Sequence, residues 1–167
     1  MAETATRAQI LTAWIVVIIA AALVVLGLLW YGLSAEVHSR IWKDIFERPG
    51  GPMSFRFILQ PTMAALAALH DGIRDARLGR DPYLWTVLAN PQKRAGRLRE
   101  ALIATGRILL LGFAMDGIYQ ATVLKTFYPG EMVIIAVLLA FVPYLLLRGS
   151  FARIARWWMS RQSAGSV

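Results

Sequence analysis

The chain of 167 residues is 57% hydrophobic and only 17% charged, whereas soluble domains are about 45–50% apolar and about 25% charged. This composition excludes a typical soluble protein and indicates a lipid environment. The 18 Lys and Arg exceed the 10 Asp and Glu, and the net charge of +8 favours contact with anionic phospholipid head groups. Because the chain has no cysteine and two histidines, we expect neither a disulfide nor a metal site, and no sequence pattern indicates a cofactor.

The first apolar segment covers residues 14–31 and contains no charged residue. A helix of this length would be about 27 Å long, close to the thickness of a bilayer's hydrocarbon core. Trp14, Trp30 and Tyr31 stand at its ends, where interfacial aromatic residues are usually found. We therefore expect residues 1–34 to form an N-terminal transmembrane helix.

Residues 35–107 form a basic region that is too long to be a simple connection. Within it, residues 57–70 are apolar but would give only about 21 Å of helix, and Pro61 lies near their start. Continued further along the chain, the segment becomes amphipathic and its charges gather in the second half. We expect a helix over residues 55–79 that lies in the membrane interface or re-enters one leaflet, rather than a span.

Two further apolar segments, residues 108–127 and 132–147, are joined by residues 128–131, which include Pro129 and Gly130. Pro and Gly supply the backbone angles of a tight turn, so residues 108–147 predict a transmembrane helical hairpin. The remaining residues, 148–167, alternate arginines with aromatic and apolar residues and predict a basic amphipathic tail.

The distribution of positive charge orients these segments. If residues 55–79 stay on one side, residues 35–107 and 148–167 share a compartment and hold 16 of the 18 Lys and Arg. The positive-inside rule makes that compartment the cytoplasm, with the N-terminus periplasmic. A four-span arrangement would place Arg40, Lys43, Arg48 and Arg56 outside, so three spans are favoured. The expected fold is an all-α integral membrane protein with three transmembrane helices and interfacial amphipathic helices.

Cations at the ends of the expected spans are candidates for contact with anionic lipid, because such side chains meet phosphates where a helix enters the bilayer. These candidates are Lys93, Arg94, Arg97, Arg99, Arg107, Arg148, Arg153 and Arg156. A simpler interpretation is that they only anchor the topology. No fold signature of a nucleic-acid reader is present, so we do not expect nucleic acid as a partner.

Asp116 is the most informative single residue, because it falls near the middle of an expected span. Insertion of Asp at a helix centre costs about 2.5–3.5 kcal/mol, so the group should be neutral, paired or facing water. Tyr119 and Gln120 lie one turn later on the same helix face, and the hairpin geometry predicts a contact with Tyr144 or the Leu139 carbonyl. The face could relay protons or cations, or it could simply clamp helices together.

The chemical groups are too few for a catalytic site, and three spans are too few to enclose a substrate pathway. We therefore expect a non-enzymatic accessory or scaffold protein that binds another membrane protein, or itself, through the Asp116 face. The alternative is an oligomeric transporter or channel component in which Asp116 passes protons or cations.

Four short motifs also suggest a family. They are Phe46-Glu47-Arg48-Pro49-Gly50-Gly51-Pro52, Leu59-Gln60-Pro61, Met115-Asp116-Gly117-Ile118-Tyr119-Gln120 and Tyr128-Pro129-Gly130-Glu131. Over about 100 residues the chain resembles a type of small uncharacterised bacterial inner-membrane protein. The resemblance implies a helical membrane fold in a bacterial plasma membrane, and it implies no activity, cofactor or ligand.

Overall fold

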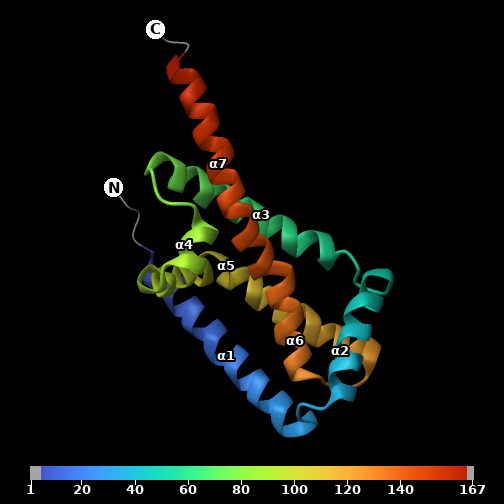
Figure 1. Ribbon diagram of the computed structural model, residues 1–167. Coiled ribbons are helices and arrows are strands. Elements are labelled where there is room, and N and C mark those ends of the chain that lie inside the picture. The colour runs from blue at the N-terminus through green and yellow to red at the C-terminus, as the bar shows by residue number, and fades with distance from the viewer. Residues whose placement is uncertain (1–4, 165–167) are drawn as a thin grey trace.

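The computed structural model describes residues 5–164, and over that range the chain is helical with no strand. In chain order the elements are α1 (Arg7–Tyr31), α2 (Ala35–Glu47), η1 (Arg48–Gly50), α3 (Arg56–Arg77), α4 (Tyr83–Ala89), α5 (Pro91–Tyr119), η2 (Gln120–Leu124), α6 (Pro129–Ala136), η3 (Val137–Phe141) and α7 (Val142–Ala164) (Figure 1). Three stretches are long and apolar enough to cross a membrane: Arg7–Tyr31, Pro91–Leu124 and Pro129–Gln162. An all-helical protein with three such helices, as predicted, is confirmed.

The α1 helix touches the rest of the molecule along a narrow strip. Its buried residues are Ala13 and Val16. Glycines allow its backbone to come close to its neighbours: a Cβ atom on Gly106 of α5 would lie 3.4 Å from Thr12, and one on Gly27 would lie 2.9 Å from the backbone nitrogen of Gly130. Such small-residue contacts are typical of helix packing in membranes. Most of the remaining α1 surface faces outward.

These contacts also fix the direction of α1. Its N-terminal part lies beside Gly106, near the middle of α5, and its last residue, Tyr31, donates a hydrogen bond to the carbonyl of Phe127, in the turn that follows η2, at 2.8 Å. The two helices therefore run in the same direction. Thr6, at the start of α1, and Arg148, in α7, line one cavity, so both ends of the described chain lie toward one end of the bundle. The sequence predicted termini on opposite sides of the membrane, and the side on which each terminus lies stays a prediction.

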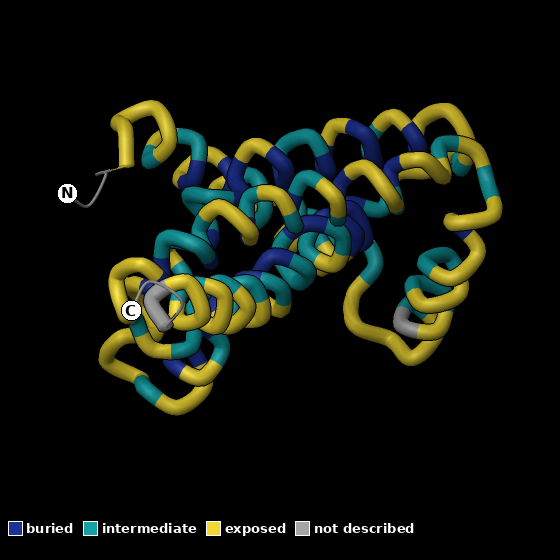
Figure 2. Tube along the Cα trace, turned by 90° about the horizontal axis from the view of Figure 1, so that it is seen from above, coloured by how far each residue is buried: buried dark blue, intermediate teal, exposed yellow. Residues whose placement is uncertain are grey.

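The α3 helix packs against the bundle along one face and makes its most extensive contacts with α7. Its inward ridge repeats every four residues and comprises Arg56, Gln60, Ala64, Ala68, Gly72 and Ala76, all buried. Figure 2 shows buried positions recurring along the central helices, and along α3 they alternate with exposed ones. A Cβ atom on Gly72 would lie 2.9 Å from the carbonyl oxygen of Arg148. A helix therefore exists within the predicted range 55–79, and its buried ridge packs against α7 and α5.

The long helices extend beyond the apolar segments. α5 begins at Pro91, where the side chain of Asn90 caps the helix by accepting from the Lys93 N–H at 3.2 Å, and not at residue 108. α7 continues without interruption to Ala164, so residues 148–164 are the end of a long helix and not a separate tail (Figure 1). Pro143 has no backbone N–H to donate, yet the helix continues through it. The π-helical segment η3 directly precedes it, and such a segment is a common place for an irregularity in the backbone hydrogen bonds of a helix.

Candidate functional site: two buried ion clusters

Asp116 is fully buried and accepts hydrogen bonds on both carboxylate oxygens. Its Oδ1 accepts from Arg48 and, at 2.8 Å, from Nη1 of Arg56. Its Oδ2 accepts from the side-chain amide of Gln120 at 2.7 Å. Arg48 and Arg56 are only 2% and 1% exposed, so this is an ion pair that the protein shields from its surroundings. We call this group, together with Glu131, the Asp116 cluster.

Glu131 completes the charge balance of the Asp116 cluster. Arg48 bridges the two carboxylates, since its Nη2 donates to Glu131 at 2.9 Å while its Nη1 donates to Asp116. Arg40, on α2, reaches Glu131 from the other side at 3.4 Å. The two most buried arginines therefore face two buried carboxylates. Such pairing is required, because an unpaired ion would carry the whole cost of its desolvation.

Aromatic rings surround these arginines. The guanidinium groups of Arg48 and Arg56 lie over the ring of Tyr119, at 5.0 and 4.6 Å from its centroid. Within the described residues, Nε of each arginine has no hydrogen-bond acceptor, and the electron-rich ring face is the favourable group nearby. Arg40 stacks more closely, at 3.5 Å, on the ring of Tyr128. The rings help to hold the cations away from lipid.

Gln120 connects the Asp116 cluster to the turn between α5 and α6. Its Oε1 accepts from the Tyr128 N–H at 2.7 Å, and its Nε2 donates to the Tyr128 carbonyl at 3.1 Å. The side chain thereby pairs the Tyr128 N–H and adds a second donor to the Tyr128 carbonyl, which also accepts from the Met132 N–H. Asp116, Tyr119 and Gln120 do share one face, as the sequence predicted, but that face points into the protein.

The short segment between α2 and α3 delivers the two arginines. Pro49 follows Arg48 and occupies the start of the single 3₁₀ turn η1, after α2 ends at Glu47. Arg56 begins α3 only a few residues later. Sequence reasoning missed both partners because it searched for them within the hairpin. Two features of the sequence could have indicated the pairing. Asp116 lies in the middle of a predicted span and therefore needs a cationic partner, and Arg48 and Arg56 flank the turn formed by residues 49–55.

A second buried cluster lies at the other end of α3. The Arg148 guanidinium donates two hydrogen bonds to the Asp75 carboxylate, from Nε at 2.8 Å and from Nη2 at 3.1 Å. Its Nη1 donates to the hydroxyl of Tyr144 at 2.8 Å, and that hydroxyl donates to Asp71 at 2.6 Å. Glu100 on α5 accepts from Arg148 at 3.0 Å. We call these residues the Arg148 cluster.

The predicted contact between Asp116 and Tyr144 is therefore wrong. Tyr144 is fully buried and belongs to the Arg148 cluster, whereas Asp116 binds the arginines at the start of α3. The prediction assumed that the two hairpin helices face only each other. Instead α3 packs across both helices and supplies a different partner at each of its ends. Glu131, in the turn of the same hairpin, likewise pairs with residues outside the hairpin, Arg40 and Arg48.

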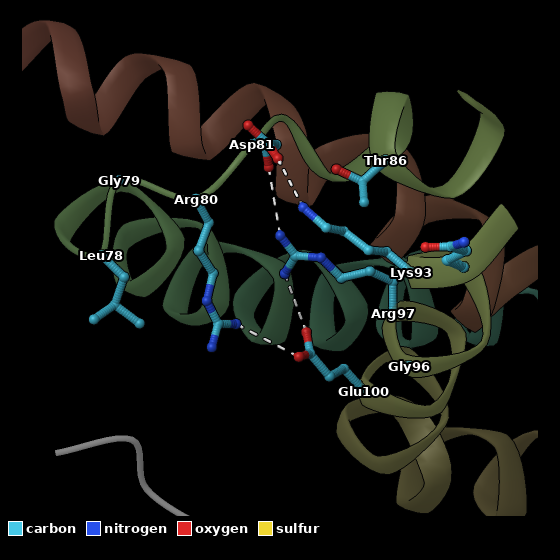
Figure 3. Close-up of a pocket in the computed structure, with 10 residues that line it drawn as sticks. Leu78, Gly79, Arg80, Asp81, Thr86, Lys93, Gly96, Arg97 and Glu100 are labelled. Atoms are coloured by element: carbon cyan, nitrogen blue, oxygen red, sulfur yellow. Dashed lines mark hydrogen bonds and ion pairs between the residues drawn. The ribbon is translucent and has the colours of Figure 1, made fainter. Parts of the chain in front are cut away.

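Glu100 of the Arg148 cluster also lines an open surface cavity of about 570 Å³. Figure 3 shows Arg80 and Arg97 both directed at Glu100, and Lys93 at Asp81. Beneath them, burial raises the pKa of the Tyr83 phenol to about 12, and its hydroxyl donates to the carbonyl of Arg97. The surface of this cavity is lined by paired charges rather than by free cations.

The structure divides the predicted lipid-contacting cations into two groups. Arg97 and Arg148 are buried in the Arg148 cluster and cannot reach head groups, because their side chains bind Asp75 and Glu100. The other six are exposed or half-buried: Lys93, Arg94, Arg99, Arg107, Arg153 and Arg156. Of these, Arg94 and Arg156 donate to backbone carbonyls of Val87, Leu88 and Arg80. The prediction is corrected for the two buried arginines.

Chemically, both clusters are closed ion networks. The oxygens of Asp116 accept hydrogen bonds from three donors, the side chains of Arg48, Arg56 and Gln120. No three His, Cys, Asp or Glu side chains among residues 5–164 gather where they could hold a metal ion. In comparisons with known proteins, no protein-family model, no curated protein and no solved structure matches this chain.

Proposed function

We propose that the chain is a non-enzymatic accessory or scaffold protein of the bacterial inner membrane, which binds another membrane protein or a second copy of itself along α1. The observation that carries this proposal is the uncovered side of α1. Its large apolar side chains are exposed to between 39% and 76%: Leu11, Trp14, Ile15, Val17, Ile18, Val24, Val25, Leu28, Leu29 and Trp30. A helix held by so narrow a strip has most of its surface available to a partner helix.

The Asp116 cluster supports this role more than transport. A proton or cation relay needs a carboxylate that can release its partners, and Asp116 is held by Arg48 and Arg56 together. The cluster ties the α2–α3 connection to α5 and α6, which is a structural task. The sequence suggested the Asp116 face as the surface that binds a partner, and we now propose the exposed side of α1 in its place. The channel alternative depended on an Asp116 carboxylate that could pass protons or cations, and the ion pairs of Asp116 with Arg48 and Arg56 argue against that role.

The membrane setting completes the proposal. α5 and α6–α7 form the transmembrane hairpin, and the exposed cations near the starts of α1 and α5 and the end of α7 face the cytoplasm and its anionic lipid. α2 carries Trp42 and Phe46 on its exposed side, 50% and 77% exposed, and lies in the opposite interface, where aromatic residues are favoured. α4, with Trp85 and Leu88 exposed to 69% and 64%, lies in the cytoplasmic interface.

Site-specific photo-crosslinking in cells tests the proposed surface. A photoreactive amino acid replaces Ile18, which is 63% exposed, and in a control variant it replaces Val16, which is 2% exposed. We expect the Ile18 variant to give a discrete protein adduct and the Val16 variant to crosslink only within the chain. If Ile18 and Leu29, which is 76% exposed, both yield lipid adducts alone, α1 is a simple anchor and the proposal fails.

A further inference from the structure

We infer that α3 is a fourth membrane-crossing helix, whose outward face is covered by lipid acyl chains. The directions of the helices require a return crossing. α1 and α5 run parallel, so if both cross the membrane, the chain between them must cross back. α3 runs the other way: its first residue, Arg56, binds Asp116 late in α5, and Asp75, near its end, shares Arg148 with Glu100 early in α5.

The distance that α3 covers fits the bilayer. Arg56 and Asp75 are 19 positions apart, about 28 Å of α-helix. On α5 the matching residues, Asp116 and Glu100, are 16 positions apart, about 24 Å. The two ion clusters thus stand near opposite ends of a slab close to the ~30 Å hydrocarbon core. Between them the helix carries no charged residue until Asp71.

The side chains of α3 are arranged inside out compared with those of a soluble helix. Its small residues, Ala64 and Ala68, are fully buried, whereas the large apolar residues Ile58 and Leu66 are 73% and 62% exposed. In water this arrangement would leave large apolar side chains exposed to solvent, which is unfavourable. In lipid, the association of helices depends instead on close contact between small residues. The outward face of α3 therefore suits acyl chains, and an aqueous surface does not.

The charge distribution agrees with four crossings. Residues 1–13, 70–107 and 148–167 would share one side, and they hold 13 of the 18 Lys and Arg and 5 of the 10 Asp and Glu. All of the net charge of +8 lies there, while residues 14–69 and 108–147 sum to zero. Arginines that would otherwise violate the positive-inside rule, such as Arg48 and Arg56, are neutralised by Asp116 and Glu131.

This arrangement also explains the Asp116 cluster. The segment between η1 and α3 is non-helical chain next to the membrane core, and such backbone is tolerated only where the protein covers it and satisfies its polar groups. Arg48 and Arg56 stand on either side of that segment and both bind Asp116. The carboxylate fixes the start of the returning helix against α5.

Cysteine labelling tests the crossing directly, because the chain has no cysteine of its own. Single cysteines replace Gly50 and Gly96, where an added Cβ meets no atom within 4 Å. Exposed Thr126 and Ser160 mark the two ends of the bundle as controls. With a membrane-impermeant maleimide added to spheroplasts, we expect Gly50→Cys to label together with Thr126→Cys, and Gly96→Cys and Ser160→Cys to label only after permeabilisation. Labelling of Gly50→Cys together with Gly96→Cys would overturn the inference.

A second measurement examines the lipid contact itself. A nitroxide attached at Leu66→Cys in protein reconstituted into phosphatidylglycerol and phosphatidylethanolamine vesicles should collide more with oxygen, which dissolves in lipid, than with a water-soluble nickel chelate. A nitroxide at Leu138→Cys, 36% exposed within the apolar stretch Pro129–Gln162, is the lipid-facing reference. If the Leu66 label instead favours the chelate while the Leu138 label favours oxygen, α3 faces water and does not cross the bilayer.

Discussion

Replacing Asp116 by asparagine keeps the size of the side chain but removes its charge. Arg56, which is 1% exposed, then loses its one ion pair among the described residues, and Arg48 keeps only Glu131. Removing one partner of a buried ion pair costs about 3–5 kcal/mol, because the other charge stays buried and uncompensated. A hydrogen bond between membrane helices contributes only about 0.6 kcal/mol on average, so the size of the loss distinguishes the two kinds of contact.

The assay is thermal unfolding of the purified protein in a mild detergent, followed by circular dichroism. For a chain of this size, 1 kcal/mol shifts Tm by about 2–4 °C, so Asp116→Asn should lower Tm by about 6–20 °C. The matched control is Glu47→Gln, whose pair with Lys43 spans 3.9 Å between side chains that are 65% and 72% exposed, and which should change Tm by no more than about 4 °C. If the two variants unfold at the same temperature, the ion pair does not stabilise the fold.

Three further predictions concern other parts of the bundle. Gly72→Ala should lower stability by about 1–3 kcal/mol in the same assay, because its Cβ would lie 2.9 Å from a backbone oxygen of α7; Gly96→Ala, which meets nothing within 4 Å, should be neutral or stabilising. Arg148→Gln should cost about 1.5–3 kcal/mol, because Asp75 loses its shortest hydrogen bonds and keeps only the longer contacts with Arg80 and Arg97, at 3.3 and 3.5 Å. Exposed Arg153→Gln should cost under about 0.5 kcal/mol. Because the pKa of Tyr83 is raised to about 12, its phenol should titrate as a late step in the absorbance at 295 nm, and Tyr83→Phe should abolish that step. The raised pKa also makes stability depend on pH: the contribution of Tyr83 is complete below about pH 10 and is lost as the pH rises toward 12.

The sequence was sufficient to predict the parts of the fold that depend on continuous apolar segments. Residues 14–31 lie within α1, and the hydrophobicity of such a segment needs no knowledge of its neighbours. The turn near Pro129 and Gly130 likewise follows from local backbone preferences. For Asp116, the physical cost of a buried charge predicted that the residue is neutral, paired or facing water, and it is paired with Arg48 and Arg56.

What the sequence did not reveal depends on which helix faces are buried. The sequence predicted an amphipathic helix over residues 55–79 but not which of its residues pack against other helices, and Leu66 and Leu69 are 62% and 38% exposed. The four-residue repeat of Ala64, Ala68 and Gly72 was the informative pattern, because lipid reverses the rule that large apolar residues lie inside. The partners of Asp116 are 60 and 68 positions away, and no local pattern specifies so distant a contact.

The most direct test of the account is a double-mutant cycle between Asp116 and Arg56. It compares the stabilities of Asp116→Asn, Arg56→Gln and the double variant with that of the unmodified protein, all measured by thermal unfolding in the same detergent. If the two side chains form the buried ion pair that joins α3 to α5, the double variant should be more stable than the sum of the single losses predicts, by at least about 1.5 kcal/mol. Losses that add to within about 0.5 kcal/mol would show that the residues act independently and would contradict the structural role assigned to Asp116.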